Sequence, residues 1–337
     1  MIRIGVVGYG NLGQGVAKAV GLCPDMELRA VFTRRNPNLI KITDSSVAVL
    51  SVDSAVDMVD DIDVMVLCGG SASDLPEQGP FFASMFNTVD SYDTHAKIPE
   101  YMASIDAVAK NKIAIISSGW DPGLFSIMRV LFEAILPDGD NYTFWGEGLS
   151  QGHSDAIRRI KGVLYAAQYT IPVESAVDSV RSGMRPVLET RQKHLRKCFI
   201  VTDDSADKTE IENAIISMPH YFADYDTSVC FIDADEFAKN HMEMPHGGMV
   251  LRSGSTVIGN TGNTGSDSSG IGSHNQHMEF SLKLDSNPGF TGSVLAAYAR
   301  AAYRMSKEGL FGAKTVFDVP LSYLAAKDRL EIIKELL

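Results

Sequence analysis

Long hydrophobic runs and paired cysteines are both missing from this sequence of 337 residues. No stretch approaches the roughly 18 to 20 uninterrupted apolar residues that a membrane span requires, and the N-terminal "MIRIGVVGYG" has no small-residue cleavage site of a secretory signal. The four cysteines, at positions 23, 68, 198 and 230, form no CxxC pair, so we expect them to be reduced and buried. These absences together favour a cytoplasmic protein.

Basic residues are also fewer than acidic residues in this sequence. Lys and Arg number 30 against 42 Asp and Glu, which gives a formal net charge of -12. Proteins that bind nucleic acid or anionic membranes need a basic face that displaces counterions. The composition therefore argues against both kinds of partner, and any local cluster of basic residues needs a local explanation.

Strand-like apolar segments alternate with helix-like segments over residues 1–125 of a chain that is long enough for two domains. The strands are almost continuously apolar, which is typical of a parallel sheet covered by helices on both faces. We predict strands at 2–7, 27–33, 47–52, 63–70, 87–92 and 112–119, and helices at 14–22, 74–86 and 98–111.

Beyond residue 125 the predicted strands alternate between apolar and polar residues. At 278–285, "MEFSLKLD", the side chains of Met278, Phe280, Leu282 and Leu284 share one face. Further strands are predicted at 141–146, 168–173, 197–203, 228–234 and 247–254. We therefore expect a second, α+β domain with an open mixed sheet that is covered by helices on one face.

Two later segments differ sharply in composition. Residues 252–275 are dense in Gly, Ser, Thr and Asn and predict a long surface loop or an extended hairpin. Residues 291–309, "TGSVLAAYARAAYRMSKEG", predict one helix that is capped near Thr291 or Ser293 and ended by Gly309.

Three glycines follow the first predicted strand directly. Gly8, Gly10 and Gly13 form G-x-G-x-x-G between that strand and a helix. The first glycine permits a tight turn, the second lets a pyrophosphate approach the backbone, and the third lets the helix pack closely on the strand. The pattern predicts a Rossmann-type dinucleotide-binding domain, and a glycine-rich turn without a ligand is the alternative.

The second predicted strand ends in Thr33, Arg34 and Arg35. An NAD-binding domain usually places an acidic residue here, about 20 residues after the glycines, to bind the adenosine ribose. Hydroxyl and guanidinium groups instead suit a 2′-phosphate, which arginine can bind through two parallel hydrogen bonds. The pattern therefore favours NADP over NAD, although a solvated arginine pair at a strand end is the alternative.

The segment "GLSQG" at 148–152 matches G-x-S-x-G, the nucleophile elbow of α/β-hydrolases. Ser150, His153 and Asp155 nevertheless lie too close in sequence to form the usual triad, which draws its Asp and His from later loops. The N-terminal dinucleotide pattern also does not belong in a hydrolase, so we reject this function.

Histidines are grouped at positions 241, 246, 274 and 277, with Glu243 nearby. Their spacings, H-x4-H and H-x2-H, are not standard zinc spacings and no cysteine joins them. We predict loop histidines that form hydrogen bonds, and no metal.

Two carboxylates follow neighbouring predicted strands, Asp93 in "VDSYDTH" and Asp121 in "SSGWDPG". In open α/β sheets the carboxyl ends of the strands line the ligand crevice, so the pair suggests a site for a cationic group. Ordinary turn chemistry is the alternative for each. Trp120 and Trp145, the only tryptophans, adjoin these loops and could pack in the core or line a pocket.

The sequence resembles the meso-diaminopimelate dehydrogenase family. The resemblance extends from the first strand to the last long helix and is most distinctive in "TFWGEGLSQGHSDAIRRIKGV". It is also carried by "GYGNLGQG", "FTRR", "CGGSASDLPEQ", "VDSYDTH", "SSGWDPGLFSI", "QYTIP", "MPHGG" and "AAYARAAYRM".

This resemblance implies an NADP-dependent enzyme of lysine and cell-wall biosynthesis. Such an enzyme converts the D-centre of meso-2,6-diaminopimelate reversibly to L-2-amino-6-oxopimelate and ammonia. It also implies a homodimer, with a dinucleotide-binding domain at 1–120 plus about 295–337 and a dimerisation and substrate domain at 121–294. The C-terminal segment would pack back on the first domain.

The resemblance also implies roles for individual residues. Asp93 and Asp121 would bind the reacting ammonium, and either carboxylate, or a water that they hold, could be the base. The rest of the substrate would contact Trp120, Trp145, Gln151, Gly152, Thr170, Arg196, His246 and Asn275. Besides the residues named above, NADP would contact Tyr9, Asn11, Leu12, Cys68, Gly69, Gly70, Ser71, Ser91, Tyr92, Pro122 and Gly123.

Two other functions remain open at this point. A relative on the same scaffold could act on simple D-amino acids with broader specificity. Alternatively, the chain could be a non-enzymatic NADPH sensor whose second domain binds a partner.

Overall fold

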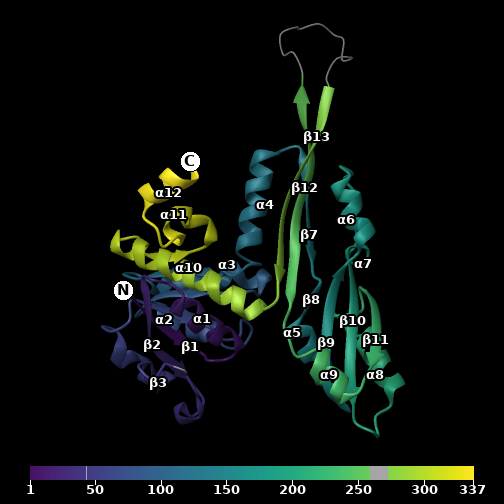
Figure 1. The fold of residues 1–337 in the computed structure, drawn as a ribbon, viewed down its shortest axis with the longest axis horizontal. Helices are drawn as coiled ribbons and strands as arrows, with labels where there is room; N and C mark the ends of the chain where they lie inside the picture. The colour runs from purple at the N-terminus through teal and green to yellow at the C-terminus, as the bar shows by residue number, and fades with distance from the viewer. Residues whose placement is uncertain (43, 259–271) are drawn as a thin grey trace. The chain divides into compact units, whose positions relative to one another are not determined.

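The computed structural model describes residues 1–42, 44–258 and 272–337, and the chain divides into two compact units (Figure 1). Unit 1 combines residues 1–127 with residues 288–337, and unit 2 contains residues 128–287. Helix α4 (Leu124–Ile135) crosses the boundary between them. Among the described residues, no helix is both long and apolar enough to cross a bilayer.

Unit 1 contains a sheet of seven parallel strands in the order β14-β6-β5-β4-β1-β2-β3. The strands are β1 (Ile2–Val7), β2 (Met26–Thr33), β3 (Ala48–Ser51), β4 (Val64–Leu67), β5 (Asn87–Asp90), β6 (Ile113–Ile115) and β14 (Gly312–Lys314). The first six were predicted. The sequence pattern missed β14 because three residues with one buried alanine give no apolar run.

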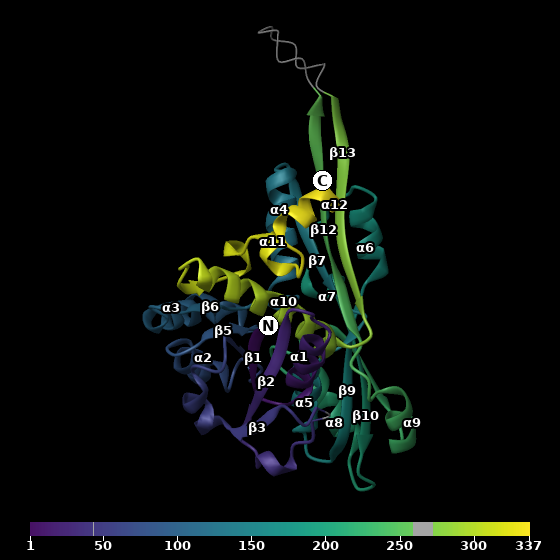
Figure 2. The ribbon, with the colours of Figure 1, turned by 60° about the vertical axis from the view of Figure 1, so that its left-hand side comes forward.

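Helices cover both faces of this sheet. Its strands point alternate side chains to opposite faces, which explains their continuous apolar character. Helices α1 (Asn11–Gly21), α10 (Asn287–Lys307), α2 (Leu75–Ala83) and α3 (Ile98–Val108) lie beside the sheet (Figure 2). One apolar cluster joins the sheet to α1 and α10, and another joins it to α2 and α3. The predicted parallel sheet and the return of the C-terminal segment to the first domain are therefore confirmed.

The long C-terminal helix differs from the prediction at its start. Helix α10 begins at Asn287 and not near Thr291 or Ser293, because Pro288 fits the first turn, where its missing N–H costs nothing. The helix ends at Lys307, shortly before Gly309, whose φ of 75° stops the helix as predicted. The remaining elements of unit 1 are α11 (Leu321–Leu324), α12 (Arg329–Leu336) and the 3-10 turns η1 (Pro37–Leu39), η2 (Val52–Met58), η3 (His95–Lys97) and η4 (Val316–Asp318).

The described residues of unit 2 form two sheets where the sequence suggested one. The mixed sheet has the order β11-β10-β9-β8, with only β10 and β11 parallel, and the antiparallel sheet has the order β13-β12-β7. Helices α5 and α8 pack against one face of the mixed sheet, and α9 packs against part of the other. The strands are β7 (Gly139–Trp145), β8 (Gly148–Leu149), β9 (Val163–Pro172), β10 (His194–Thr202), β11 (Asp226–Phe231), β12 (His246–Ile258) and β13 (Gly272–Leu284). The helices are α5 (Gln151–Arg158), α6 (Glu174–Arg181), α7 (Thr190–Lys193), α8 (Lys208–Ile216) and α9 (Ala234–Asn240).

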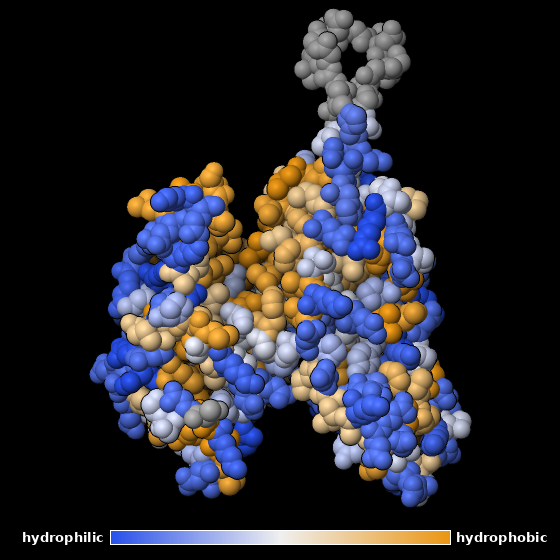
Figure 3. Space-filling model, viewed as in Figure 1, coloured by the Kyte–Doolittle hydropathy of each residue, from blue (hydrophilic) through white to orange (hydrophobic). Residues whose placement is uncertain are grey.

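Strands β12 and β13 form a long antiparallel hairpin. The alternation predicted for 278–285 is present, because Leu284 is buried and Met278, Phe280 and Leu282 are half-buried while their neighbours are exposed. The outer part of the hairpin is hydrophilic (Figure 3). Of the segment 252–275, both ends are strand, and residues 259–271 lie outside the described part.

Candidate functional site

The turn between β1 and α1 has the geometry of an anion-binding turn. Gly8 has a φ of 90°, and a Cβ on Gly13 would lie 2.0 Å from the carbonyl oxygen of Gly8. A Cβ on Gly10 would meet no described atom within 4 Å, which leaves room for a ligand against the backbone. No side chain caps α1 and no acidic residue lies in its first turn, so its N-terminal N–H groups can donate to an anion.

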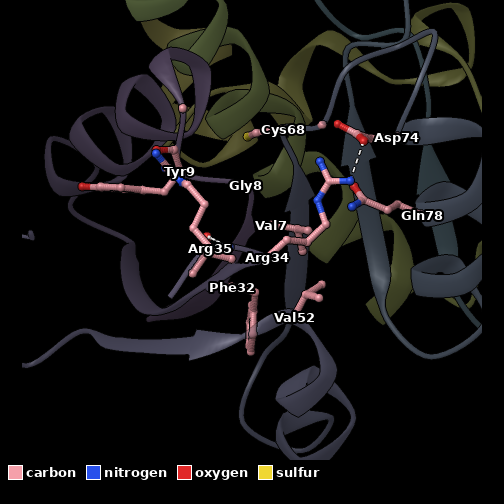
Figure 4. A pocket seen from close by; sticks show the side chains of 13 residues that line it. Val7, Gly8, Tyr9, Phe32, Arg34, Arg35, Val52, Cys68, Asp74 and Gln78 are labelled. Carbon is pink, nitrogen blue, oxygen red and sulfur yellow. Dashed lines mark hydrogen bonds and ion pairs between the residues drawn. The ribbon is translucent and has the colours of Figure 1, made fainter. Parts of the chain in front are cut away.

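A cavity of about 270 Å³ opens beside this turn, where β1, β2 and β4 end (Figure 4). Strand β1 lies between β2 and β4, so the cavity lies where the strand order reverses, the usual nucleotide position in such sheets. Eight of the residues predicted to bind cofactor line it, namely Gly8, Tyr9, Gly10, Thr33, Arg34, Arg35, Cys68 and Gly69. The lining also includes Val7, Phe32, Val52, Asp74 and Gln78, which sequence reasoning missed.

The paired arginines are held at the cavity by different partners. Arg34 Nη1 lies 2.9 Å from Asp74 Oδ1, and the other oxygen of Asp74 accepts a hydrogen bond from the Gly70 N–H (2.9 Å). Arg35 donates from Nη2 to the Tyr9 carbonyl oxygen (2.8 Å) (Figure 4). Two guanidinium groups therefore lie at the end of β2, where an NAD enzyme would carry a carboxylate.

The other predicted cofactor residues do not line this cavity. Asn11, Leu12 and Gly13 lie in the first turn of α1, and Gly70 and Ser71 continue the loop after β4. Ser91, Tyr92, Pro122 and Gly123 follow β5 and β6. The Tyr92 ring is buried and stacks on Tyr101 with their centroids 4.1 Å apart, so its side chain is a core group. Cofactor contacts for these residues stay predictions.

Asp93 and Asp121 follow β5 and β6, which are neighbours in the sheet. Asp93 is exposed, and its backbone N–H donates to Ser71 Oγ (3.1 Å). Asp121 is half-buried. Trp120 is only 8% exposed and meets Phe125 edge to face, with centroids 5.2 Å apart, so in unit 1 it is mainly a core residue.

Unit 2 brings Thr170 and Arg196 together on neighbouring strands. They are cross-strand partners on β9 and β10, and Arg196 Nη1 donates to Thr170 Oγ1. The guanidinium lies 3.8 Å from the centroid of the Tyr225 ring. Arg196 is buried, its Nε has no hydrogen-bond partner among the described residues, and burial lowers its pKa. A buried cation with an unused donor is suited to bind an anionic ligand.

The "GLSQG" loop lies against the "MPHGG" segment. The His246 ring lies over Gly148, where an added Cβ would be 2.6 Å from the ring, and the Leu149 N–H donates to the Pro245 carbonyl oxygen (2.8 Å). Gln151 Nε2 donates to Met244 Sδ (2.7 Å). Burial lowers the pKa of His246. Because Gly148 is also the register partner of Thr170, these contacts bring Gln151 and His246 near the Arg196 pair.

Asn275 and the "GLSQG" serine pattern do not form the arrangements that the sequence raised. Asn275 pairs with Ser255, nine residues along β12 from His246, so the strand rise places it roughly 30 Å from His246. The structure therefore does not bring Asn275 together with the other residues of this cluster. Ser150 Oγ and His153 Nδ1 lie 2.6 Å apart, but Asp155 pairs with Arg158, so no Ser-His-Asp triad forms.

Trp145 is held by a buried histidine. Its backbone N–H donates to His194 Nε2 (2.8 Å), and the two rings stack with centroids 5.3 Å apart, which leaves Trp145 38% exposed. Burial lowers the pKa of His194 to about 4, with further contributions from the charges of Arg196 and Lys193. His194 is therefore neutral near pH 7 and can accept this hydrogen bond.

We expect His194 to make the folded state sensitive to acid. The unfolded chain takes up this proton near pH 6.5 and the folded chain only near 4, so the unfolded state binds more protons in that window. The free energy of unfolding should fall as pH decreases from 6.5 to 4, by up to roughly 3 kcal/mol from this group. Urea unfolding at several pH values measures this dependence. The free energy of unfolding should change less steeply with pH in His194→Gln than in the wild type, and an equally steep change would contradict the assignment.

Comparisons with known proteins find relatives that match this chain over its full length. Residues 119–286 match the family model described as diaminopimelic acid dehydrogenase C-terminal domain. The whole chain is 58% identical to meso-diaminopimelate D-dehydrogenase of Acetivibrio thermocellus and covers 98% of it. An engineered D-amino acid dehydrogenase bound to NADP+ superposes with a TM-score of 0.83 at 42% identity, over 100% of this chain and 99% of that one.

A third similar protein is a variant of meso-DAP dehydrogenase from Clostridium tetani E88, whose crystal structure is with DAP. It has a TM-score of 0.90 and 49% identity, and the match covers 100% of both chains. In that variant a glutamine, a threonine, an arginine, a proline, a histidine and an asparagine are replaced. The first five follow one another at intervals of 19, 26, 49 and 1 residues.

Proposed function

The chain belongs to the meso-diaminopimelate dehydrogenase family, and we propose that it catalyses the NADP-dependent oxidative deamination of meso-2,6-diaminopimelate. The D-centre is oxidised to an imine with transfer of a hydride to NADP+, and water hydrolyses the imine to the ketone L-2-amino-6-oxopimelate and ammonia; the reaction is reversible. The observation that carries the proposal is Arg196 of unit 2, a buried cation beside Thr170 and the "GLSQG" loop that is suited to bind a substrate carboxylate.

The turn after β1 and the cavity beside it fit NADP. The open backbone at Gly10 and the start of α1 would hold the pyrophosphate, and Arg34 and Arg35 would hold the 2′-phosphate. When bound, NADP+ would supply the hydride acceptor, and the residues of this chain would position the substrate and the cofactor. The engineered relative bound to NADP+ supports this cofactor.

Replacing both arginines should change cofactor preference. The double variant Arg34→Ala, Arg35→Ala loses charge-assisted hydrogen bonds to the 2′-phosphate, so the Kd for NADPH should rise by about 10²-fold or more while the Kd for NADH changes little. Fluorescence titration with both cofactors measures this. Arg29→Ala is the matched control, because Arg29 is an exposed arginine on β2, the strand that Arg34 and Arg35 follow. Equal losses for both cofactors would show that the pair has another role.

The substrate carries two ammonium groups and two carboxylates, so it needs both anionic and cationic partners. We assign the reacting ammonium to Asp93 and Asp121 of unit 1, and either residue, or a water that they hold, removes a proton before the hydride leaves. We assign the distal end of the substrate to unit 2. Its ligands there would be Trp145, Gln151, Gly152, Thr170, Arg196 and His246.

The spacing of these residues supports the assignment to unit 2. Gln151, Thr170, Arg196, Pro245 and His246 follow one another at the same four intervals as the first five residues replaced in the Clostridium tetani variant. Those replacements were made in a relative whose structure is with DAP. Asn275 does not keep the remaining interval, so its role rests on the family resemblance alone.

Initial rates with purified protein test the proposed function. NADPH should form with meso-diaminopimelate and NADP+, slowly with the L,L isomer, and slowly with NAD+. The similarity to an engineered D-amino acid dehydrogenase makes a broader D-amino acid dehydrogenase the second candidate. Activity mainly on D-alanine would favour that candidate, and NADPH binding without turnover of either substrate would indicate a sensor.

A homodimer in the cytoplasm is also part of the proposal. Helix α4 exposes the apolar side chains of Val130, Leu131 and Ile135, which a second copy of the chain could cover. Light scattering should give twice the monomer mass, and a monomeric mass would contradict the dimer. Cell fractionation tests the location.

A further inference from the structure

One buried carboxylate at the end of β5 has no role in the proposed reaction. Asp90 is 1% exposed and accepts three hydrogen bonds. Its Oδ1 accepts from the Tyr92 N–H (2.9 Å) and the Ser117 N–H (3.0 Å), and its Oδ2 accepts from the Tyr101 hydroxyl (2.8 Å). A carboxylate has only acceptors, so it matches these three donors, whereas an apolar side chain would leave two buried N–H groups unpaired.

The two backbone donors lie in the two segments that carry Asp93 and Asp121. The Tyr92 N–H immediately precedes Asp93 in the loop after β5. In the loop after β6, Ser117 has a left-handed φ of 54°, which is uncommon for a residue with a side chain. The carbonyl oxygen of Asp90 also accepts from the Ser118 N–H (2.9 Å) and from Ser118 Oγ (2.8 Å). Asp90 therefore joins both loops within four residues of each carboxylate.

Two helices hold the third donor in place. Tyr101 on α3 stacks on Tyr92, with centroids 4.1 Å apart. A Cβ on Gly79 of α2 would lie 2.1 Å from the Tyr101 hydroxyl oxygen, so only glycine leaves room for this hydroxyl. A single methyl group on α2 would thus displace the Tyr101 hydroxyl from Asp90, while both backbone N–H donors to Asp90 would stay in place.

We infer that Asp90 is a positioning residue that sets the two catalytic carboxylates, Asp93 and Asp121, relative to each other through the backbone of their loops. This rests on the proposed function. Both loops leave neighbouring parallel strands. Without the Asp90 side chain, the hydrogen bonds described between the two strand ends are those from Ser118 to the Asp90 carbonyl oxygen, and the Tyr92 and Ser117 N–H groups no longer share an acceptor. The alternative is a buried carboxylate that only stabilises unit 1.

Three variants separate these two roles. Asp90→Ala removes the shared acceptor, Asp90→Asn keeps one oxygen for the two backbone N–H groups, and Gly79→Ala displaces Tyr101. Asp25→Ala is the matched control, because Asp25 accepts from Arg300 (2.6 and 2.8 Å) and precedes β2 at the opposite end of the sheet. The readouts are kcat and KM for meso-diaminopimelate, the Kd for NADPH and the melting temperature.

We expect kcat to fall by about 10²-fold in Asp90→Ala, because a misplacement of about 1 Å has an effect of this size. The NADPH Kd should change much less than kcat, because the substituted residues do not line the cavity that would hold the 2′-phosphate at Arg34 and Arg35. Asp90→Asn should recover kcat to within about tenfold of wild type, since it loses at most one hydrogen bond. The Asp25→Ala control should lower the melting temperature and leave kcat unchanged.

The inference is wrong if folded Asp90→Ala, with wild-type NADPH affinity, keeps kcat within about twofold. If Asp90→Ala does not fold, Asp90→Ser is tested in its place, because a hydroxyl oxygen lies one bond short of Oδ1 and cannot reach both backbone N–H groups, and a kcat within twofold of wild type in that folded variant would overturn the inference. Gly79→Ala keeps both backbone hydrogen bonds to Asp90, so its kcat should stay within about tenfold of wild type. Wild-type enzyme is assayed first. An inactive wild type counts against the proposed function, whereas an active wild type with a fully active Asp90→Ala counts only against the role of Asp90.

Discussion

Asparagine in place of either Asp93 or Asp121 should lower kcat/KM for meso-diaminopimelate by at least about 10²-fold, because positioned acid-base groups contribute about 10²- to 10⁴-fold. Each substitution removes a negative charge from the end of β5 or β6, where we place the reacting ammonium. An amide also cannot take the proton that must leave before hydride transfer. The folded state should tolerate both changes, since neither side chain is fully buried.

The pH dependence of kcat distinguishes the base from its neighbour. The variant that lacks the base should lose the acidic limb of the profile, whereas the variant that lacks only an ammonium ligand should keep the limb at reduced kcat. If both variants keep the limb, a water held by the pair is the better assignment. Asp57→Asn, an exposed carboxylate elsewhere in unit 1, controls for the loss of charge and should be fully active. Near wild-type activity in both variants would remove Asp93 and Asp121 from the mechanism.

Methionine in place of Arg196 should have opposite effects on stability and on substrate binding. Truncating one partner of a buried, hydrogen-bonded charge pair costs about 2 to 5 kcal/mol, so the KM for meso-diaminopimelate should rise by about 10²-fold or more. In the free protein, however, Arg196 is a desolvated cation with an unpaired Nε. An apolar side chain of similar length removes that cost, so the melting temperature should stay the same or increase.

Parallel measurements on Lys197→Met complete this experiment. Lys197 is the next residue on β10 and is exposed, so the variant loses the same charge without touching the Arg196 cluster. Its KM should match that of the wild type. A large drop in the melting temperature of Arg196→Met, with an unchanged KM, would show that Arg196 stabilises unit 2 and does not bind substrate.

Much of unit 1 could be predicted because its signals are local. The glycines between β1 and α1 and the continuous apolar strands each reflect the backbone next to them. Strand β14 was not predicted, because its place in the sheet comes from pairing with β6 and not from a pattern in its own residues. The division of unit 2 into two sheets was not predicted for the same reason. Alternation of apolar and polar residues indicates that one face of a strand is buried, but it does not identify the strand that lies beside it.

The predicted site residues had a similar limit. Arg34 and Arg35 were found because their distance from the glycines has a known meaning. Asp74 and Asp90 were missed because an aspartate before a helix or at a strand end is ordinary in sequence. Only the structure shows that Asp74 pairs with Arg34 in the cavity and that Asp90 receives donors from two loops. Asn275 shows a related limit, because a motif match carries no information about distance along the hairpin, and its contact with substrate stays a prediction.

The late position of β14 and α10 in the chain has a consequence for synthesis. A ribosome completes β1 to β6 and then the whole of unit 2 before it reaches residues 287–314. Until then, the edge of β6 lacks its neighbour, and one face of the nascent sheet lacks the helix that shares its apolar cluster. Pairings that span about two hundred residues close slowly, and unpaired edges invite aggregation. Unit 1 is therefore the first unit whose translation begins and the last whose fold is completed.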